Sequence, residues 1–278
     1  MRKRRLAAEL RRLRKESGLT REQVAERVGC APITITRIET AQSGARLGEV
    51  SLMLEAYGIT GEEREAMLQV ARDARKRGWW HPYTRAIPDW FQVYIGIEEE
   101  ASSIRDYQPE VVPGLLQTEG YVRAVAMAEP VVPPIEEIDR QVMLRLGRQE
   151  RLLEPEDAPD MWFVVGEGVL HRLTGGASVQ REQLDHLIEL SHLPNVTIQV
   201  LPFEAGAHAG MQGGFTILGF PEPADPDVVY VEYRRGGLYL EMQADIDSYI
   251  LTFDHLRAQA LGRSESRALI AQVVKQLT

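Results

Sequence analysis

The feature that most constrains the fold is a short stretch near the N-terminus in which apolar residues recur at helical spacing around one glycine. Val24 and Val28 precede Gly29 on one helical face, and Ile35 and Ile38 follow it on another. Glycine readily adopts the left-handed backbone that a tight turn between two helices requires. The stretch therefore predicts two short helices that are joined by a tight turn and share one core.

Signals on either side extend this pattern to five helices. Thr20 and Gln23 have the spacing of a capping box, and Pro32 suits the first turn of a helix, where a missing N–H costs nothing. The predicted helices begin near Leu6 and end before Gly18, and then cover residues 20–28, 31–40, 47–57 and 60–77. We therefore predict an all-α N-terminal domain over residues 1–78, and a composition shift at Trp79-Trp80-His81-Pro82 marks its boundary.

Charge is distributed unequally along the chain. Residues 1–78 hold 17 Lys and Arg against 11 Asp and Glu, whereas residues 79–278 hold 15 against 30. Local positive charge is what phosphate binding needs, because neutralised phosphates release counterions. The distribution predicts double-stranded DNA as the partner of the N-terminal domain and a sensing or assembly role for the acidic remainder.

The segment from Leu19 to Glu39 resembles the helix-turn-helix of the Cro and phage-repressor (xenobiotic-response-element) family. The resemblance implies that the third helix enters the major groove of DNA and that its first side chains meet base edges. The side chains that match these base-reading positions are Pro32, Ile33, Thr34, Thr36 and Arg37.

Arg37 is the principal candidate among them, because a guanidinium bonds bidentately to guanine. Pro32 and Ile33 suit contact with thymine methyl groups, but they replace the long polar residues common at these positions in the family. Part of the specificity would then come from DNA shape.

A second set of residues matches the family's backbone-contacting positions. Arg21 begins the second helix, where its guanidinium and the free N–H groups suit a phosphate, and the following loop contributes Thr40, Ser43 and Arg46. Arg5 belongs to a basic run at residues 2–5. This run either reaches the DNA backbone or minor groove, or is a solvated basic terminus.

Composition excludes several other classes of protein. The sequence has no apolar run of about eighteen residues, so no membrane span is predicted. The single cysteine, Cys30, rules out an intramolecular disulfide and fits a reducing cytoplasm. We expect a cytoplasmic protein that associates with the nucleoid when it binds DNA.

The C-terminal domain, residues 79–278, is predicted to be α+β with a mainly antiparallel sheet. Predicted helices lie near residues 89–105, 115–128, 134–153, 178–193, 243–261 and 265–277. Predicted strands cover residues 161–165, 196–201, 215–220, 228–233 and 238–241. Gly- or Pro-rich stretches separate the last four strands, which predicts an antiparallel meander.

This domain resembles a domain of uncharacterised function found behind such heads in many actinomycete regulators. The matching stretches begin at Glu99, Val112, Arg145, Asn195 and Val229. The resemblance implies a regulator, often encoded beside a small acidic partner protein and sometimes described as antitoxin-like. Because such heads usually read two half-sites, we expect a homodimer.

The stretch Val112-Pro-Gly-Leu-Leu-Gln-Thr permits two interpretations. In the first, Gln117, with Trp79 and Trp80, lines a ligand pocket or a partner groove. In the second, Pro-Gly is a turn, Thr118 caps a helix, and the tryptophans seal one domain against the other.

Catalysis is not expected from this sequence. The six histidines lack metal-ligand spacing, and Glu98-Glu-Glu100 is expected to be a solvated helix face. We predict no metal, no cofactor and no enzymatic activity. The predicted function is a sequence-specific repressor or autoregulator that receives a small-molecule or protein signal; an antitoxin-like interaction module is the alternative.

Overall fold

The computed structural model describes residues 2–39, 43–73, 87–153, 158–221 and 225–277. The chain divides into two compact units, Met1–Trp79 and Trp80–Thr278, here called the first and second units. The predicted boundary between residues 78 and 79 lies outside the described residues.

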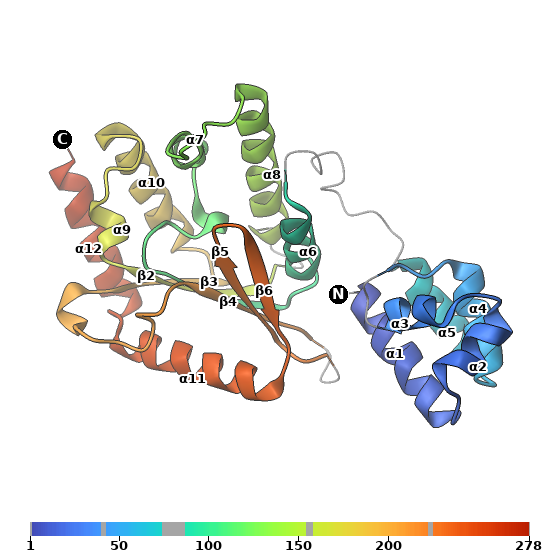
Figure 1. The fold of residues 1–278 in the computed structure, drawn as a ribbon. Coiled ribbons are helices and arrows are strands. Elements are labelled where there is room, and N and C mark those ends of the chain that lie inside the picture. Colours follow the sequence, from blue (N-terminus) through green and yellow to red (C-terminus); the bar gives the residue numbers. More distant parts are fainter. Residues whose placement is uncertain (1, 40–42, 74–86, 154–157, 222–224, 278) are drawn as a thin grey trace. The chain divides into compact units, whose positions relative to one another are not determined.

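The first unit is all-α, as predicted, and its described residues form five helices (Figure 1). The helices are α1 (Arg2–Glu16), α2 (Arg21–Val28), α3 (Pro32–Glu39), α4 (Leu47–Ala56) and α5 (Gly61–Asp73). The backbone of the basic run at residues 2–5 belongs to α1, so it begins a helix and is not an extended arm.

The local signals in the sequence account for the ends of α2 and α3. The Thr20 hydroxyl accepts from the Gln23 backbone N–H at 3.3 Å, and the Gln23 side chain accepts from the Thr20 N–H at 2.9 Å. Gly29 has φ 75°, in the left-handed region that favours glycine. Val24, Ile35 and Ile38 are buried together in the shared core, so the predicted two-helix unit is confirmed.

The second unit is α+β, as predicted. Its helices are α6 (Asp89–Glu98), α7 (Glu119–Met127), α8 (Ile135–Leu153), α9 (Gly168–His171), α10 (Ala177–Leu190), α11 (Gln243–Gln259) and α12 (Arg263–Gln276). Its strands are β1 (Ser103–Gln108), β2 (Asp160–Gly166), β3 (Val196–Leu201), β4 (Phe215–Gly219), β5 (Val228–Tyr233) and β6 (Gly236–Leu240).

The six strands form one mixed sheet in the order β3-β2-β1-β4-β5-β6. Pairs β1–β4, β4–β5 and β5–β6 are antiparallel, whereas β1–β2 and β2–β3 are parallel. The sheet is thus mainly antiparallel, as predicted. The predicted four-strand meander is wrong at its first strand, because β3 pairs with β2 and not with β4.

The prediction of one helix over residues 89–105 is wrong in its last part. The helix ends at Glu98, and β1 follows as a central strand of the sheet. β1 carries polar residues such as Arg105 and Asp106, so its sequence lacks the apolar run expected of a central strand. Asp106 is polar because it lines the cavity described below.

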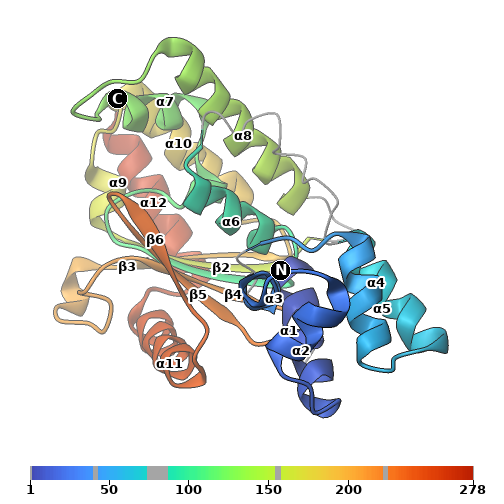
Figure 2. The same cartoon turned by 45° about the vertical axis from the view of Figure 1, so that its right-hand side comes forward.

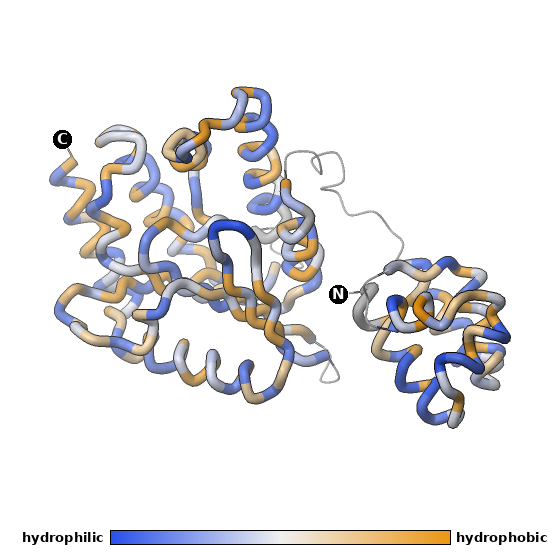
Figure 3. Tube along the Cα trace, in the orientation of Figure 1, coloured by the Kyte–Doolittle hydropathy of each residue, from blue (hydrophilic) through white to orange (hydrophobic). Residues whose placement is uncertain are grey.

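Helices cover both faces of the sheet. In Figures 1 and 2, α11 lies on one face, while α6, α7, α8 and α10 lie on the other. Hydrophobic and hydrophilic residues alternate along these helices in Figure 3, as expected of helices with one buried face.

Strand alternation gives the two faces different chemistry. Tyr107, Phe215 and Val229 belong to the apolar core shared with α11. Their neighbours point to the opposite face, because successive side chains of a strand alternate. Register places Asp106 opposite Thr216 and Thr216 opposite Tyr230, which makes a polar row across three strands.

Candidate nucleic-acid interface and a cavity in the second unit

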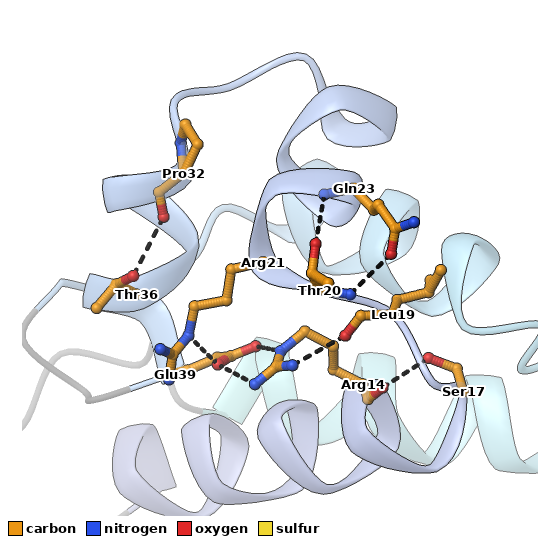
Figure 4. Close-up of polar contacts among 9 residues, drawn as sticks. All are labelled: Arg14, Ser17, Leu19, Thr20, Arg21, Gln23, Pro32, Thr36 and Glu39. Atoms are coloured by element: carbon orange, nitrogen blue, oxygen red, sulfur yellow. Dashed lines mark hydrogen bonds and ion pairs between the residues drawn. The ribbon is translucent and has the colours of Figure 1, made fainter.

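The predicted base-reading residues lie on the solvent side of α3. Pro32 and Arg37 are exposed, and the Ile33 residue retains 55% of its accessible surface. Thr34 and Thr36 are half-buried, and the Thr36 hydroxyl donates to the Pro32 carbonyl at 3.2 Å (Figure 4). An exposed isoleucine at the start of a helix favours an apolar contact such as a thymine methyl.

A buried carboxylate anchors the end of α3. Glu39 has a fully buried side chain that accepts from Arg14 Nε at 2.6 Å and from Arg21 Nε at 2.9 Å (Figure 4). The hydrogen bond to Glu39 raises the pKa of Arg14. This network joins α1, α2 and α3, and the sequence analysis missed it because its members are far apart in the chain.

The predicted phosphate contacts have different surroundings. Arg21 is one-third exposed at the first position of α2, and its Nε is already bonded to Glu39. The Ser43 backbone N–H donates to the Arg37 carbonyl at 3.1 Å, which ties the loop after α3 to that helix. Arg46 is exposed just before α4. Thr40 and the Arg5 side chain lie outside the described residues.

The second unit contains a partly enclosed cavity of about 580 Å³ on the sheet face opposite α11. The polar row of β1, β4 and β5 forms one wall, while α6, α7, α8 and the segment of residues 111–117 form the others. Aromatic rings continue from α6 onto the sheet: the Tyr94 ring lies 5.4 Å from Phe91 and 4.4 Å from Tyr230. The volume falls in the range of small-molecule sites.

One ion pair beside the cavity is almost completely buried. Arg148 donates from Nε and Nη2 to the two oxygens of Glu98, at 2.7 and 2.6 Å, and both side chains are at most 4% exposed. Its guanidinium also lies 5.3 Å from the centre of the Phe91 ring. The expectation that Glu98 belongs to a solvated face is therefore wrong: a glutamate at the end of a helix was buried by a partner fifty residues away.

Arg145, one turn earlier on α8, also lines the cavity but has a different environment. Among the described residues it makes no hydrogen bond and no ion pair. Burial, together with the nearby charge of Arg148, lowers the pKa of Arg145 to about 10. A side chain at Gly114 would place its Cβ 2.3 Å from Arg145 Nη1, so this glycine leaves room for the guanidinium.

Two acidic side chains face the same cavity. Asp106 is buried, and its Oδ1 accepts from Gln108 at 2.9 Å and from Thr216 at 3.2 Å. Burial raises the pKa of Asp106 to about 7. Glu232 lines the cavity from β5; burial raises its pKa as well, against the opposing effect of its bond with Tyr230.

Gln117 lines the cavity, and it also holds the 112–118 segment together. Its Nε2 donates to the Val112 carbonyl at 2.6 Å, and the Gln117 carbonyl accepts from Gln149 Nε2 at 2.7 Å. Thr118 caps α7, as the structural interpretation predicted. Trp79 and Trp80 lie outside the described residues.

Several of the stretches that resemble the actinomycete domain meet at the cavity, but of its polar residues only Gln117 was predicted as a site residue. The available signal was the spacing of Arg145 and Arg148, which puts two arginines on one face of a helix next to Leu144.

Within the described part of the chain, no helix is long and apolar enough to cross a membrane. The described residues contain no group of three His, Cys, Asp or Glu side chains that could hold a metal ion.

Comparison with known families agrees with this division. Residues 91–272, more than half of the chain, match the family model described as a domain of unknown function (DUF5753). Residues 5–67 match the model of a helix-turn-helix domain, which indicates a DNA-binding regulator. No curated protein and no solved structure matches the chain.

Proposed function

The chain belongs to the family described as a domain of unknown function (DUF5753) and carries a helix-turn-helix domain, and from this premise we propose that it is a sequence-specific transcription regulator. The observation that carries the proposal is the surface of α3, on which Pro32, Ile33 and Arg37 are exposed while the opposite face is buried. In this proposal α3 enters the major groove, as in Cro-like regulators.

The roles of the side chains follow from their chemistry. Arg37 reads guanine, Ile33 and Pro32 contact thymine methyl groups, and the hydroxyls of Thr34 and Thr36 contact base edges. Arg21 binds phosphate through the guanidinium nitrogens that Glu39 does not use, and Ser43, Arg46, Thr40 and Arg5 contact the DNA backbone.

We further propose that the chain acts as a homodimeric repressor or autoregulator in the cytoplasm, on the nucleoid, and has no catalytic activity. Two heads on adjacent half-sites bind far more tightly than one. The second unit would then contribute to dimerisation and receive the signal, because an effector must favour one of two states of different DNA affinity.

A second candidate, the antitoxin-like module that binds a small partner protein, is favoured by a different observation. The segment from α7 to α8 exposes Met127, Val131, Val132 and Ile135, and Val131 is 85% exposed. Exposed apolar residues that lie together favour a protein contact.

The test compares binding of the purified protein to its own upstream DNA and to scrambled DNA, by fluorescence anisotropy at two salt concentrations. Arg37→Ala should lower the preference for upstream DNA about tenfold or more, since one bidentate contact contributes about 1–3 kcal/mol. Arg21→Ala should weaken binding to both DNAs and lower the salt slope by about 1.

Arg181→Ala is the matched control, because it removes the same charge from an exposed position in the second unit. It should leave both affinities unchanged. A wild-type protein without preference for its upstream DNA, or an Arg37→Ala variant with full preference, would contradict the proposal.

A further inference from the structure

We propose that the cavity of the second unit binds a small organic monocarboxylate, with Arg145 as the contact to the carboxylate and the Tyr94 and Tyr230 rings against the body of the ligand. The role of this ligand as the regulator's signal rests on the proposed function. The binding site itself rests on the cavity alone.

Two neighbouring arginines on α8 differ in their partners. Arg148 has both oxygens of Glu98, whereas Arg145 has no hydrogen-bond or ion-pair partner among the residues that the structure describes. Its pKa, lowered by burial to about 10, still leaves it charged at neutral pH. Arg145 is half-buried, and a cation there without a bonded anion destabilises the fold, so an anion supplied by a ligand would lessen that penalty.

The backbone next to Arg145 leaves room for its guanidinium. Gly114 lies where any Cβ would meet Arg145 Nη1. Gln149 donates to the carbonyls of Gly114 and Gln117, at 3.4 and 2.7 Å, and so fixes this loop against α8. The loop thus keeps open the space beside the guanidinium, whose planar donors can bind a carboxylate bidentately.

The other residues that line the cavity restrict the charge and size of the ligand. Asp106 and Glu232 face the same cavity, so their carboxyl groups would repel a dianion such as phosphate more strongly than a monoanion. The same carboxyl groups suit hydroxyl or amino donors elsewhere on the ligand. A volume of about 580 Å³ and the aromatic side chains leave room for a ring or an alkyl body.

The experiment uses the full chain and tryptophan fluorescence. Three of the four tryptophans, Trp80, Trp90 and Trp162, belong to the second unit, so thermal unfolding followed in this way reports mainly that unit, and Trp90 lines the cavity. The probes are naphthoate, benzoate and acetate, each compared with its neutral primary amide, and inorganic phosphate. At ten times its Kd, a carboxylate multiplies the folding equilibrium constant about 11-fold, which raises Tm by about 3–6 °C.

Three variants test whether the Tm shift caused by carboxylates depends on Arg145. Arg145→Met should raise Tm without ligand and abolish the carboxylate-specific shift, because it replaces an unpartnered cation with an apolar side chain. Gly114→Ala should keep the fold but weaken the shift, because the new Cβ displaces the end of Arg145. Arg140→Met, on the same helix and paired with Glu137, is the matched control and should respond as the wild type does.

The outcomes distinguish failure of the proposed carboxylate site from failure of the proposed regulator function. Equal shifts with carboxylates and amides, a shift with phosphate alone, or a lower Tm for ligand-free Arg145→Met would each overturn the proposal. DNA binding is measured on the same preparations: a chain that prefers its upstream DNA but ignores carboxylates refutes only the cavity, and the reverse refutes only the regulator.

Discussion

Each unit buries one glutamate close to two arginines, but the second arginine is used differently. In the first unit, Arg14 and Arg21 both bond to Glu39. In the second unit, Arg148 takes both oxygens of Glu98. Arg145, three residues earlier on the same helix, has no partner among the described residues.

The difference separates a structural arrangement from one suited to binding. The Glu39 network satisfies its charges and fastens three helices, and the proposed base reading of the first unit lies outside it, on the exposed side of α3. In the second unit the charge that Glu98 does not satisfy remains on the wall of a cavity. Unsatisfied buried charge is costly for stability, and such groups concentrate where a fold binds something.

The largest expected effect comes from Glu98→Gln. This change leaves Arg148, which is 4% exposed, without an anion and close to the unpartnered Arg145. Breaking a buried pair in this way costs about 3–5 kcal/mol. Urea unfolding followed by tryptophan fluorescence measures the loss in the second unit.

Glu136→Gln is the control for that change, because Glu136 is exposed in the first turn of α8. Its effect should stay within about 0.5 kcal/mol. If Glu98→Gln cost no more than its control, the buried pair would contribute nothing and the comparison between the units would fail.

Glu39→Gln should have a smaller effect in the first unit. Arg14 and Arg21 are 12% and 34% exposed, so water can partly replace the lost carboxylate, and the amide oxygen still accepts one bond. We expect the opening free energy of α1–α3 to fall by about 1–3 kcal/mol. Hydrogen exchange read by mass spectrometry measures it for each unit separately.

Exposed Glu26 on α2 gives the control variant Glu26→Gln, which should leave exchange in these helices unchanged. If Glu39→Gln lowered the opening free energy by as much as Glu98→Gln lowers stability, partial exposure would not reduce the cost of breaking the Glu39 network. The proposed distinction between the two networks would then be wrong.

The ends of helices were predictable because the signals are local. The Thr20–Gln23 capping box, Gly29 at φ 75° and Pro32 at the start of α3 act within one turn of chain. Sequence alone also located the exposed candidates on α3, since a buried face at helical spacing leaves the opposite face to solvent.

Long-range pairing was not predictable by these means. β3 has an apolar sequence that fits either a meander or a parallel strand, and only its partner β2 decides between them. Glu98, Arg145 and Arg148 resemble ordinary surface residues until the chain brings α6 and α8 together. The cavity therefore came from the structure, although the stretches that build it were visible in the sequence.

Asp106 extends the comparison to a carboxylate that is buried without a cation. Among the described residues it forms no ion pair, and its Oδ1 accepts from Gln108 and Thr216. Burial raises its pKa from 3.8 to about 7. The folded state therefore retains this proton after the unfolded state has lost it.

Asp106→Asn tests the sign of that effect, because the amide oxygen can accept the same two bonds without charge. In the wild type, the stability linked to this raised pKa is fully present below about pH 4 and is lost as the pH rises through about 7. Wild type and variant should therefore unfold almost alike near pH 4, and the variant should be more stable by up to about 4 kcal/mol at pH 8, because each pKa unit corresponds to about 1.4 kcal/mol. The measurement is urea unfolding across this range, with exposed Asp185→Asn as the control. A difference that stays constant with pH would mean that folding does not raise the pKa of Asp106, so its carboxylate would be ionised at neutral pH and the cavity would hold one more negative charge.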